Sequence, residues 1–202
     1  MGSLIITGGT LKGRRIEALP QPKQGPCPTR PTTSRVRESV MGILAPDLGA
    51  CRFLDAFAGT GIMGFEALSR GAEHVLAIEK NPQAIRQIAQ NIKKLSLHPP
   101  HYTVLKDSLE TLWQKTNPNN AYHVAYLDPP YATYLEKASK GLPQNALKWN
   151  ILLPLALQNQ WLTPQCRVLF EHPPQWQPTI DGWLIADQRH YGDTWVSFLT
   201  PC

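Results

Sequence analysis

The sequence lacks several patterns that would assign it to a specialised class of protein. It has no Cys-x-x-Cys pair, and its four cysteines lie far apart, at positions 27, 51, 166 and 202. Neither a structural zinc site nor a disulfide framework is therefore indicated. The six histidines are scattered as well, so we expect no bound metal.

Long apolar runs are also missing. No segment approaches the length of a bilayer span, no signal-peptide pattern opens the chain, and Ile6 stands where a myristoylation signal needs Ser or Thr. We therefore expect a cytoplasmic protein that has no membrane partner. An apolar content of 42% over 202 residues is enough for one core, in one domain with a small appendage.

Acidic residues are the scarcer charge, 15 against 20 Lys and Arg, and the formal net charge is +5. This excess favours an anionic partner, although a generally solvated basic surface explains it equally well. Lys12, Arg14 and Arg15 cluster in a Gly-rich turn between two short β-type runs, 4–6 and 15–18, which predicts a hairpin. Such a turn can bind phosphates, or it can simply be solvated.

The most informative stretch is Phe53–Gly64. The apolar run 51–57 is typical of a buried parallel strand, and Gly59 and Gly61 then form a turn that a Cβ atom would obstruct. The segment 62–70 is predicted to be a helix. A strand, a glycine turn and a helix N-terminus together form a cradle for the polar end of a nucleotide-like ligand.

Two carboxylates near this turn bear on the identity of the ligand. The spacing Gly59-x-Gly61-x-x-Gly64 fits a dinucleotide fingerprint, and Glu79 follows Gly59 by 20 residues. Asp55, however, would repel a pyrophosphate and attract a cationic or amino-bearing group, and S-adenosylmethionine has both groups and no phosphate. Glu79 ends the predicted strand 74–79, where a carboxylate can hold both ribose hydroxyls. A tight turn without any ligand is the simpler alternative.

Strands and helices alternate along most of the chain, which predicts a mostly parallel sheet. Asp107 follows the predicted strand 101–105 and can accept a hydrogen bond from an adenine amino group, or cap a helix together with Glu110. Arg35 and Arg37 flank the apolar face of a helix expected to end at Pro46 and Gly49, and we expect both to be available to solvent or phosphate. The remaining expected elements are a helix from Asn81-Pro82, strands 122–127 and 166–171, a helix over 145–162 with a break at Pro154, and a hairpin of strands 183–190 and 194–199.

The second informative stretch is Asp128-Pro129-Pro130-Tyr131, directly after a predicted strand. Two prolines supply no backbone N–H, so their carbonyls and the Asp128 carboxylate form a cluster of acceptors. Such a cluster suits an exocyclic amino group, whose nitrogen becomes nucleophilic when acceptors hold its hydrogens and free its lone pair. Tyr131 offers a face for stacking a base. The simpler interpretation is a rigid exit from the strand.

These motifs resemble class I S-adenosylmethionine-dependent methyltransferases, and nearly the whole chain is similar to the RsmD family of 16S rRNA guanine-N2 methyltransferases. The Asp-Pro-Pro-Tyr set alone is shared with DNA adenine methyltransferases, whereas the Arg-Pro-Thr and Ser-Arg-Gly-Ala blocks are specific. The residues that carry the resemblance are Gly8-Gly9, Gly13-Arg14, Arg30-Pro31-Thr32, Arg35–Glu38, Leu54-Asp55-x-Phe57-Ala58-Gly59-Thr60-Gly61, Gly64–Ala72, Glu79, Asp128–Tyr131, Glu171 and Tyr191–Thr194.

The resemblance implies a Rossmann-like, seven-stranded α/β methyltransferase sheet at 33–202 and a small β extension at 1–32 that contacts RNA. It also implies S-adenosylmethionine as cofactor, 16S rRNA or an assembling small ribosomal subunit as partner, and a monomeric enzyme. It assigns the cofactor to Asp55, Phe57, Gly59, Gly61, Glu79 and Asp107, catalysis to Asp128, Pro129, Pro130 and Tyr131, and RNA to Arg14, Arg15, Arg30, Arg35 and Arg37.

Three other functions remain open at this point. An adenine-N6 methyltransferase acting on DNA or RNA would use the same acceptors. An NAD-dependent oxidoreductase would use the glycine turn but would leave Asp128–Tyr131 without a role. A non-enzymatic RNA-binding module would need only the basic hairpin.

Overall fold

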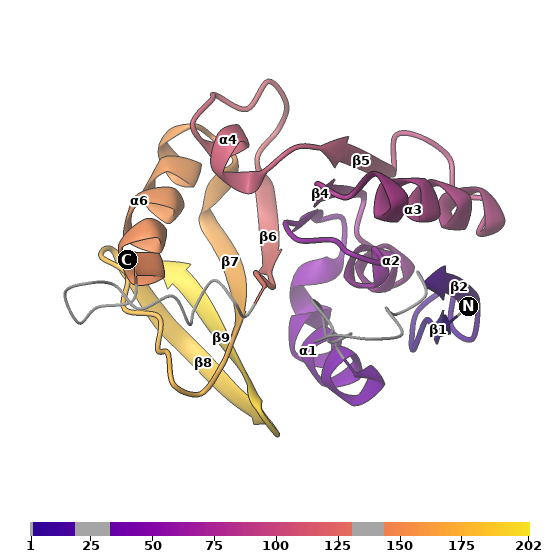
Figure 1. Ribbon diagram of the computed structural model, residues 1–202, viewed down its shortest axis with the longest axis horizontal. Coiled ribbons are helices and arrows are strands. Elements are labelled where there is room, and N and C mark those ends of the chain that lie inside the picture. Colours follow the sequence, from indigo (N-terminus) through magenta and orange to yellow (C-terminus); the bar gives the residue numbers. More distant parts are fainter. Residues whose placement is uncertain (1, 19–32, 131–143) are drawn as a thin grey trace. The chain divides into compact units, whose positions relative to one another are not determined.

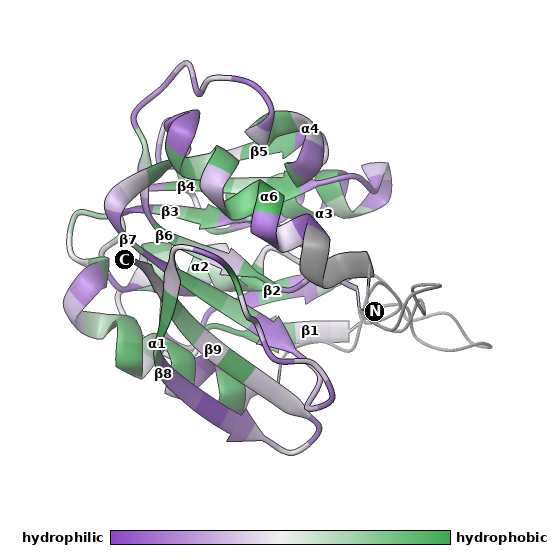
Figure 2. Cartoon of the chain, turned by 90° about the vertical axis from the view of Figure 1, so that its left-hand side faces the viewer, coloured by the Kyte–Doolittle hydropathy of each residue, from purple (hydrophilic) through white to green (hydrophobic). Residues whose placement is uncertain are grey.

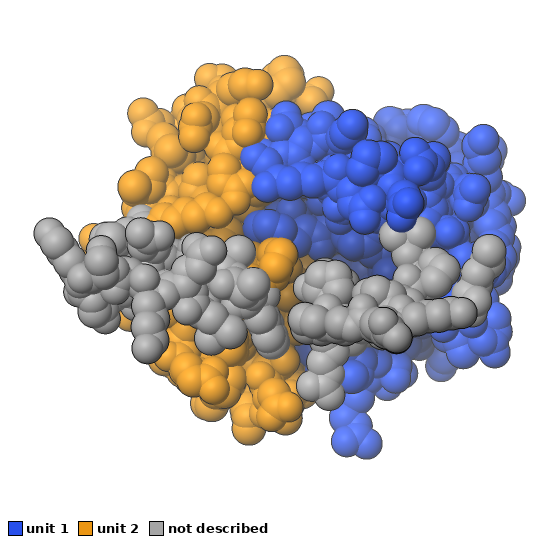
Figure 3. Space-filling view, in the orientation of Figure 1, with its two compact units in different colours: residues 1–108 blue, residues 109–202 orange. Residues whose placement is uncertain are grey.

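The structure is a computed structural model that describes residues 2–18, 33–130 and 144–202 (Figure 1). The chain divides into two compact units, residues 1–108 and 109–202 (Figure 3). The N-terminal hairpin belongs to the first unit. The domain boundary expected after residue 32 borders a segment outside the described residues, and it stays a prediction.

Unit 1 combines the predicted hairpin with a parallel three-stranded sheet. Strands β1 (Gly2–Ile5) and β2 (Arg15–Ala18) pair antiparallel, so the predicted hairpin is confirmed. Strands β3 (Arg52–Asp55), β4 (His74–Glu79) and β5 (Tyr102–Lys106) run parallel in the order β5-β4-β3. Their carboxyl ends therefore lie at one edge of the sheet, where ligands of α/β folds bind.

Three helices accompany this sheet: α1 (Ser34–Leu48), α2 (Ile62–Ser69) and α3 (Pro82–Lys94). Val36 N donates to Thr33 Oγ1 at 3.4 Å, so Thr33 caps α1. Gln83 N donates to Asn81 Oδ1 at 2.8 Å, so α3 begins at Asn81-Pro82 as predicted. Helix α1 ends at its C-cap Gly49 as expected, but the expectation that Pro46 contributes to this end is wrong, since Pro46 lies inside the helix. Pro46 lies two residues before the end of α1, so its missing N–H removes one hydrogen bond of the helix without ending it.

Unit 2 contains α4 (Leu109–Trp113), β6 (Tyr122–Leu127), α6 (Gln144–Gln158), β7 (Leu162–His172), β8 (Trp183–Tyr191) and β9 (Thr194–Pro201). Strand β6 runs parallel to β7, whereas β9 pairs antiparallel with both β7 and β8, in the order β6-β7-β9-β8. The predicted closing hairpin is thus confirmed.

The predicted helix over 145–162 is too long at its C-terminal end. Gln160 has a left-handed φ of +61°, and Trp161 N donates to Ala156 O at 2.8 Å, which closes the helix after Gln158. Strand β7 consequently begins at Leu162, four residues before the predicted start. Its pairing with β6 shifts register between Tyr122 and Val124.

The strands of the two units are those of a mixed seven-stranded α/β sheet, as predicted. Apolar residues concentrate on β3 and β4, whereas the second half of β8 is hydrophilic (Figure 2). Among the helices that the structure describes, none combines the length and the apolar character needed to span a bilayer. The described residues also contain no group of three His, Cys, Asp or Glu side chains arranged as metal ligands.

Candidate functional site

The turn between β3 and α2 adopts a backbone shape that requires glycine. Gly59 and Gly61 have φ of +50° and +75°, and a Cβ on Gly61 would lie 2.8 Å from Tyr102 Oη. At Gly64 only packing excludes a side chain, because a Cβ there would lie 2.6 Å from the same hydroxyl oxygen. A Cβ on Gly59 would meet nothing closer than 4.0 Å, so only its φ demands glycine.

The Glu79 carboxylate joins this turn to the carboxyl end of β4. Gly59 N donates to Glu79 Oε2 at 2.8 Å, and Asn81 N donates to Glu79 Oε1 at 2.7 Å. Both oxygens are thereby fixed in place, and each keeps a further lone pair for another donor. Such a carboxylate is suited to accept hydrogen bonds from two hydroxyls on neighbouring carbons, as the sequence predicted for a ribose.

Asp55 ends β3 and is buried, with 1% of its surface exposed. Its Oδ2 accepts a hydrogen bond from Gly64 N at 3.1 Å. Burial raises the pKa of the Asp55 carboxyl from 3.8 to about 7, the Gly64 bond opposes that rise, and the charge of Glu79 adds to it. Ionisation of Asp55 therefore reduces folding stability as pH rises from about 4 to 7. A cationic group beside Asp55 would lower this pKa, and the ionised carboxylate would in turn attract and bind that group.

Two further predicted cofactor residues also belong to unit 1. Phe57 is half-buried and lies between Asp55 and the first glycine of the turn. Asp107 follows β5, and its Oδ1 accepts a hydrogen bond from Ser108 N at 2.7 Å. Glu110, its partner in the alternative capping role, forms an ion pair with Lys148. The six predicted cofactor residues thus lie at or just after the carboxyl ends of β3, β4 and β5, and their role in binding stays a prediction.

The predicted catalytic stretch follows β6 in unit 2. Asp128 is half-buried, Pro129 is buried and Pro130 is exposed, whereas Tyr131 lies outside the described residues. Register pairs Leu127 of β6 with Phe170 of β7, so Glu171 comes one residue after that pair. The Tyr126 hydroxyl donates to Glu171, which is 5% exposed. Sequence analysis assigned no role to Glu171, although the resemblance included it.

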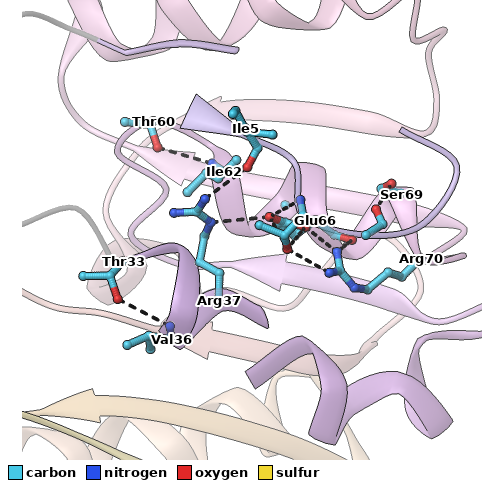
Figure 4. Close-up of polar contacts among 12 residues, drawn as sticks. Ile5, Thr33, Val36, Arg37, Thr60, Ile62, Glu66, Ser69 and Arg70 are labelled. Carbon is cyan, nitrogen blue, oxygen red and sulfur yellow. Dashed lines mark hydrogen bonds and ion pairs between the residues drawn. The ribbon is translucent and has the colours of Figure 1, made fainter. Parts of the chain in front are cut away.

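The predicted RNA-contacting arginines differ in their surroundings. Arg14, Arg15 and Arg35 are exposed, and Arg30 lies outside the described residues. The expectation that Arg37 is available to phosphate is wrong, because Arg37 is only 2% exposed. Its Nε pairs with Glu66 Oε1 at 3.4 Å and its Nη2 donates to Ile5 O at 3.1 Å (Figure 4).

Sequence reasoning assigned no role to Glu66, the buried acid on α2 that pairs with Arg37, although Glu66 lies in a block that carries the resemblance. Glu66 is 0% exposed, and it pairs with Arg70 one turn later on the same helix (Figure 4). The available signal was a lone Glu within the otherwise apolar segment 62–68, together with an Arg at the i+4 spacing.

Comparison with known proteins identifies the family. A family model described as conserved hypothetical protein 95 matches residues 4–200. Ribosomal RNA small subunit methyltransferase D from Buchnera aphidicola is 35% identical over 147 residues, which is 72% of each chain. The protein of the same name from Escherichia coli K12 is 31% identical over 170 residues, 84% of this chain and 75% of that one.

Solved structures agree on the fold. The yhhF methyltransferase structure from Escherichia coli superposes with a TM-score of 0.77 at 24% identity and covers 99% of this chain and 98% of that one. At that identity the likeness shows the fold alone. The sequence match over residues 4–200 and the curated relatives show more: the chain belongs to the RsmD family and has the fold of the class I methyltransferases.

Proposed function

We propose that the chain transfers a methyl group from S-adenosylmethionine to the exocyclic N2 amino group of a guanine in small-subunit rRNA. That it is a methyltransferase follows from its family. One observation carries the cofactor part of the proposal: backbone N–H groups hold both oxygens of the Glu79 carboxylate, Gly59 N of the glycine turn on one side and Asn81 N on the other.

The residues of unit 1 fit this cofactor. Glu79 offers two fixed acceptors for the ribose hydroxyls, and the buried Asp55 gains most from a cationic neighbour. The same Asp55 would repel the pyrophosphate of NAD, which disfavours an oxidoreductase. When bound, S-adenosylmethionine supplies an electrophilic methyl group on its sulfonium sulfur.

The residues after β6 fit the amino group that receives the methyl. The Asp128 carboxylate and the Pro129 carbonyl would accept hydrogen bonds from its two hydrogens, so that its lone pair leaves the ring system and becomes nucleophilic. Positioning and charge complementarity of this kind account for large rate enhancements. Tyr131, outside the described residues, is proposed to stack the base.

The substrate part of the proposal rests on the relatives, whose names assign them to small-subunit rRNA. Arg14, Arg15 and Arg35 are exposed and would contact its phosphates, and Arg30 is proposed to do so as well. We propose naked 16S rRNA or an assembling small ribosomal subunit as the partner, and the cytoplasm as the compartment. The monomeric state stays a prediction.

Replacing Glu79 with alanine is expected to weaken cofactor binding by roughly 1.5–3 kcal/mol, the range for a hydrogen bond to a charged group. Titration calorimetry with S-adenosylhomocysteine measures this loss. Glu73→Ala is the matched control, because Glu73 is an exposed glutamate just before the same strand. Tighter binding of NAD than of S-adenosylhomocysteine by the wild type would contradict the cofactor assignment.

Methyl-labelled small-subunit rRNA, digested to nucleosides, is expected to carry the label in N2-methylguanosine. Chromatography against nucleoside standards identifies the product. Label in N6-methyladenosine would keep the acceptor mechanism and overturn the guanine assignment. Label in a ring carbon or a ribose would overturn the mechanism too, because neither position needs acceptors to free a nitrogen lone pair.

A further inference from the structure

The turn after β1 is fastened to the helix α2 by a buried carboxylate. Thr7 donates to Glu66 Oε1 through both its backbone N, at 2.9 Å, and its Oγ1, at 3.0 Å. Since Glu66 is completely buried and also pairs with Arg37 of α1, one side chain links the hairpin to two helices (Figure 4).

The C-terminal end of α2 also binds this turn, through hydrogen bonds to Ser69. Thr10 N donates to Ser69 O at 2.7 Å, and Leu11 N donates to Ser69 Oγ at 2.8 Å. A Cβ on Gly9 would lie 1.8 Å from Ser69 O, so only glycine allows this approach. The turn that precedes the basic residues is therefore packed against α2 and not free in solvent.

A second anchor comes from α3. Asn91 is completely buried, and its side-chain amide forms two hydrogen bonds with Glu17 of β2, one with the backbone N and one with the backbone O, each 2.9 Å. Arg14 Nη2 donates to Lys94 O at 3.2 Å, and Lys94 Nζ pairs with Glu17 Oε1 at 2.6 Å. The hairpin consequently lies against both α2 and α3 (Figure 1).

This docking gathers cations from two elements far apart in the sequence. The hairpin contributes the exposed Lys12, Arg14 and Arg15, and the last turn of α3 contributes the exposed Lys93 and Lys94. Because Arg14 contacts the backbone of Lys94, the two groups adjoin. A set of cations held in place by a buried scaffold loses less conformational entropy on binding than the same cations on a flexible loop.

We infer that the hairpin and the last turn of α3 form one continuous RNA-contacting surface, in which Lys93 and Lys94 bind phosphates beside Arg14 and Arg15. Glu66 and Asn91 are the positioning residues that hold this surface together. The inference rests on the proposed function, because a polynucleotide backbone is the partner that such a surface fits.

The first test is the salt dependence of RNA binding. Lys93→Ala should weaken binding of the full chain to small-subunit rRNA and reduce the log-log salt slope by roughly one unit, as one lost phosphate contact does. Lys93→Arg should restore the slope. Lys115→Ala, which removes an exposed lysine of unit 2, is the control and should leave the slope unchanged.

The second test concerns the anchors. Thr7→Val removes one donor to Glu66, and Asn91→Leu removes both bonds to Glu17 at similar volume. Hydrogen exchange should show lost protection of the hairpin amides in each variant. The KM for rRNA should rise roughly three- to tenfold, as expected when a surface side chain must be ordered on binding, whereas kcat and S-adenosylhomocysteine affinity should not change. Thr7→Ser keeps the hydroxyl and should restore the wild-type KM.

The outcomes separate the inference from the proposed function. Suppose that the wild type methylates rRNA, that Lys93→Ala leaves the salt slope unchanged, and that Thr7→Val and Asn91→Leu lose hairpin protection without a change in KM. These results would overturn the inference and leave the proposed function standing. A wild type that neither binds nor methylates rRNA would overturn both.

Discussion

Replacing Asp128 with alanine is expected to lower kcat by roughly 10²- to 10³-fold, the usual loss when one group that stabilises a transition state is removed. The carboxylate follows β6 in unit 2, whereas the predicted cofactor residues belong to unit 1. Its acceptor oxygens matter most as the amino nitrogen becomes tetrahedral. The affinity for S-adenosylhomocysteine, measured by calorimetry, should therefore stay close to that of the wild type.

Two further variants sharpen this result. Asp128→Asn should retain part of the activity, because its amide oxygen still accepts one hydrogen bond. Asp181→Ala removes an exposed aspartate of the same unit and should leave kcat unchanged. Equal losses of turnover and of cofactor affinity in Asp128→Ala would show that Asp128 supports binding or folding and not the transition state.

Replacing Glu66 with alanine is expected to lower the free energy of unfolding by roughly 3–5 kcal/mol, the cost of leaving a buried charge without its partner. The Arg37 side chain is 3% exposed and could not regain water without moving α1. Arg70 is 16% exposed and could reach solvent more easily. Urea-induced unfolding followed by circular dichroism measures the loss.

The control is Glu73→Ala, an exposed substitution whose effect should stay within about 0.5 kcal/mol. The double variant Arg37→Met/Glu66→Leu should be more stable than Glu66→Ala, because it leaves no unpaired charge on α1. A double variant no more stable than the single one would show that the loss comes from packing or from the Thr7 bonds.

Local patterns predicted most elements of the fold. The apolar runs of β4 and β6 predicted the observed bounds of both strands, and Asn81 caps α3 where the Asn81-Pro82 pair predicted a helix start. These signals depend on neighbouring residues alone, which is why they can be read from the chain. Errors occurred at the helix C-termini, where a proline was tolerated and a left-handed Gln160 ended α6.

The candidate site, like the fold, was predictable only in part. The spacing of Gly59, Gly61 and Glu79 predicted a turn with a carboxylate at the end of the next strand. Only the structure showed that this carboxylate binds the turn through Gly59 N, because that contact joins two parallel strands. The roles of the site residues in binding and catalysis remain predictions.

The family, the order of the elements and the residues that could do chemistry were predictable from the sequence, because each depends on residue type and short-range spacing. Which charged side chains face solvent was not predictable, because it depends on how the helices and the hairpin pack. Arg35 and Arg37 look equivalent in the sequence, yet packing of α1 exposes the first and buries the second against Glu66. Burial depends on which distant segments come together, and no local pattern contains that information.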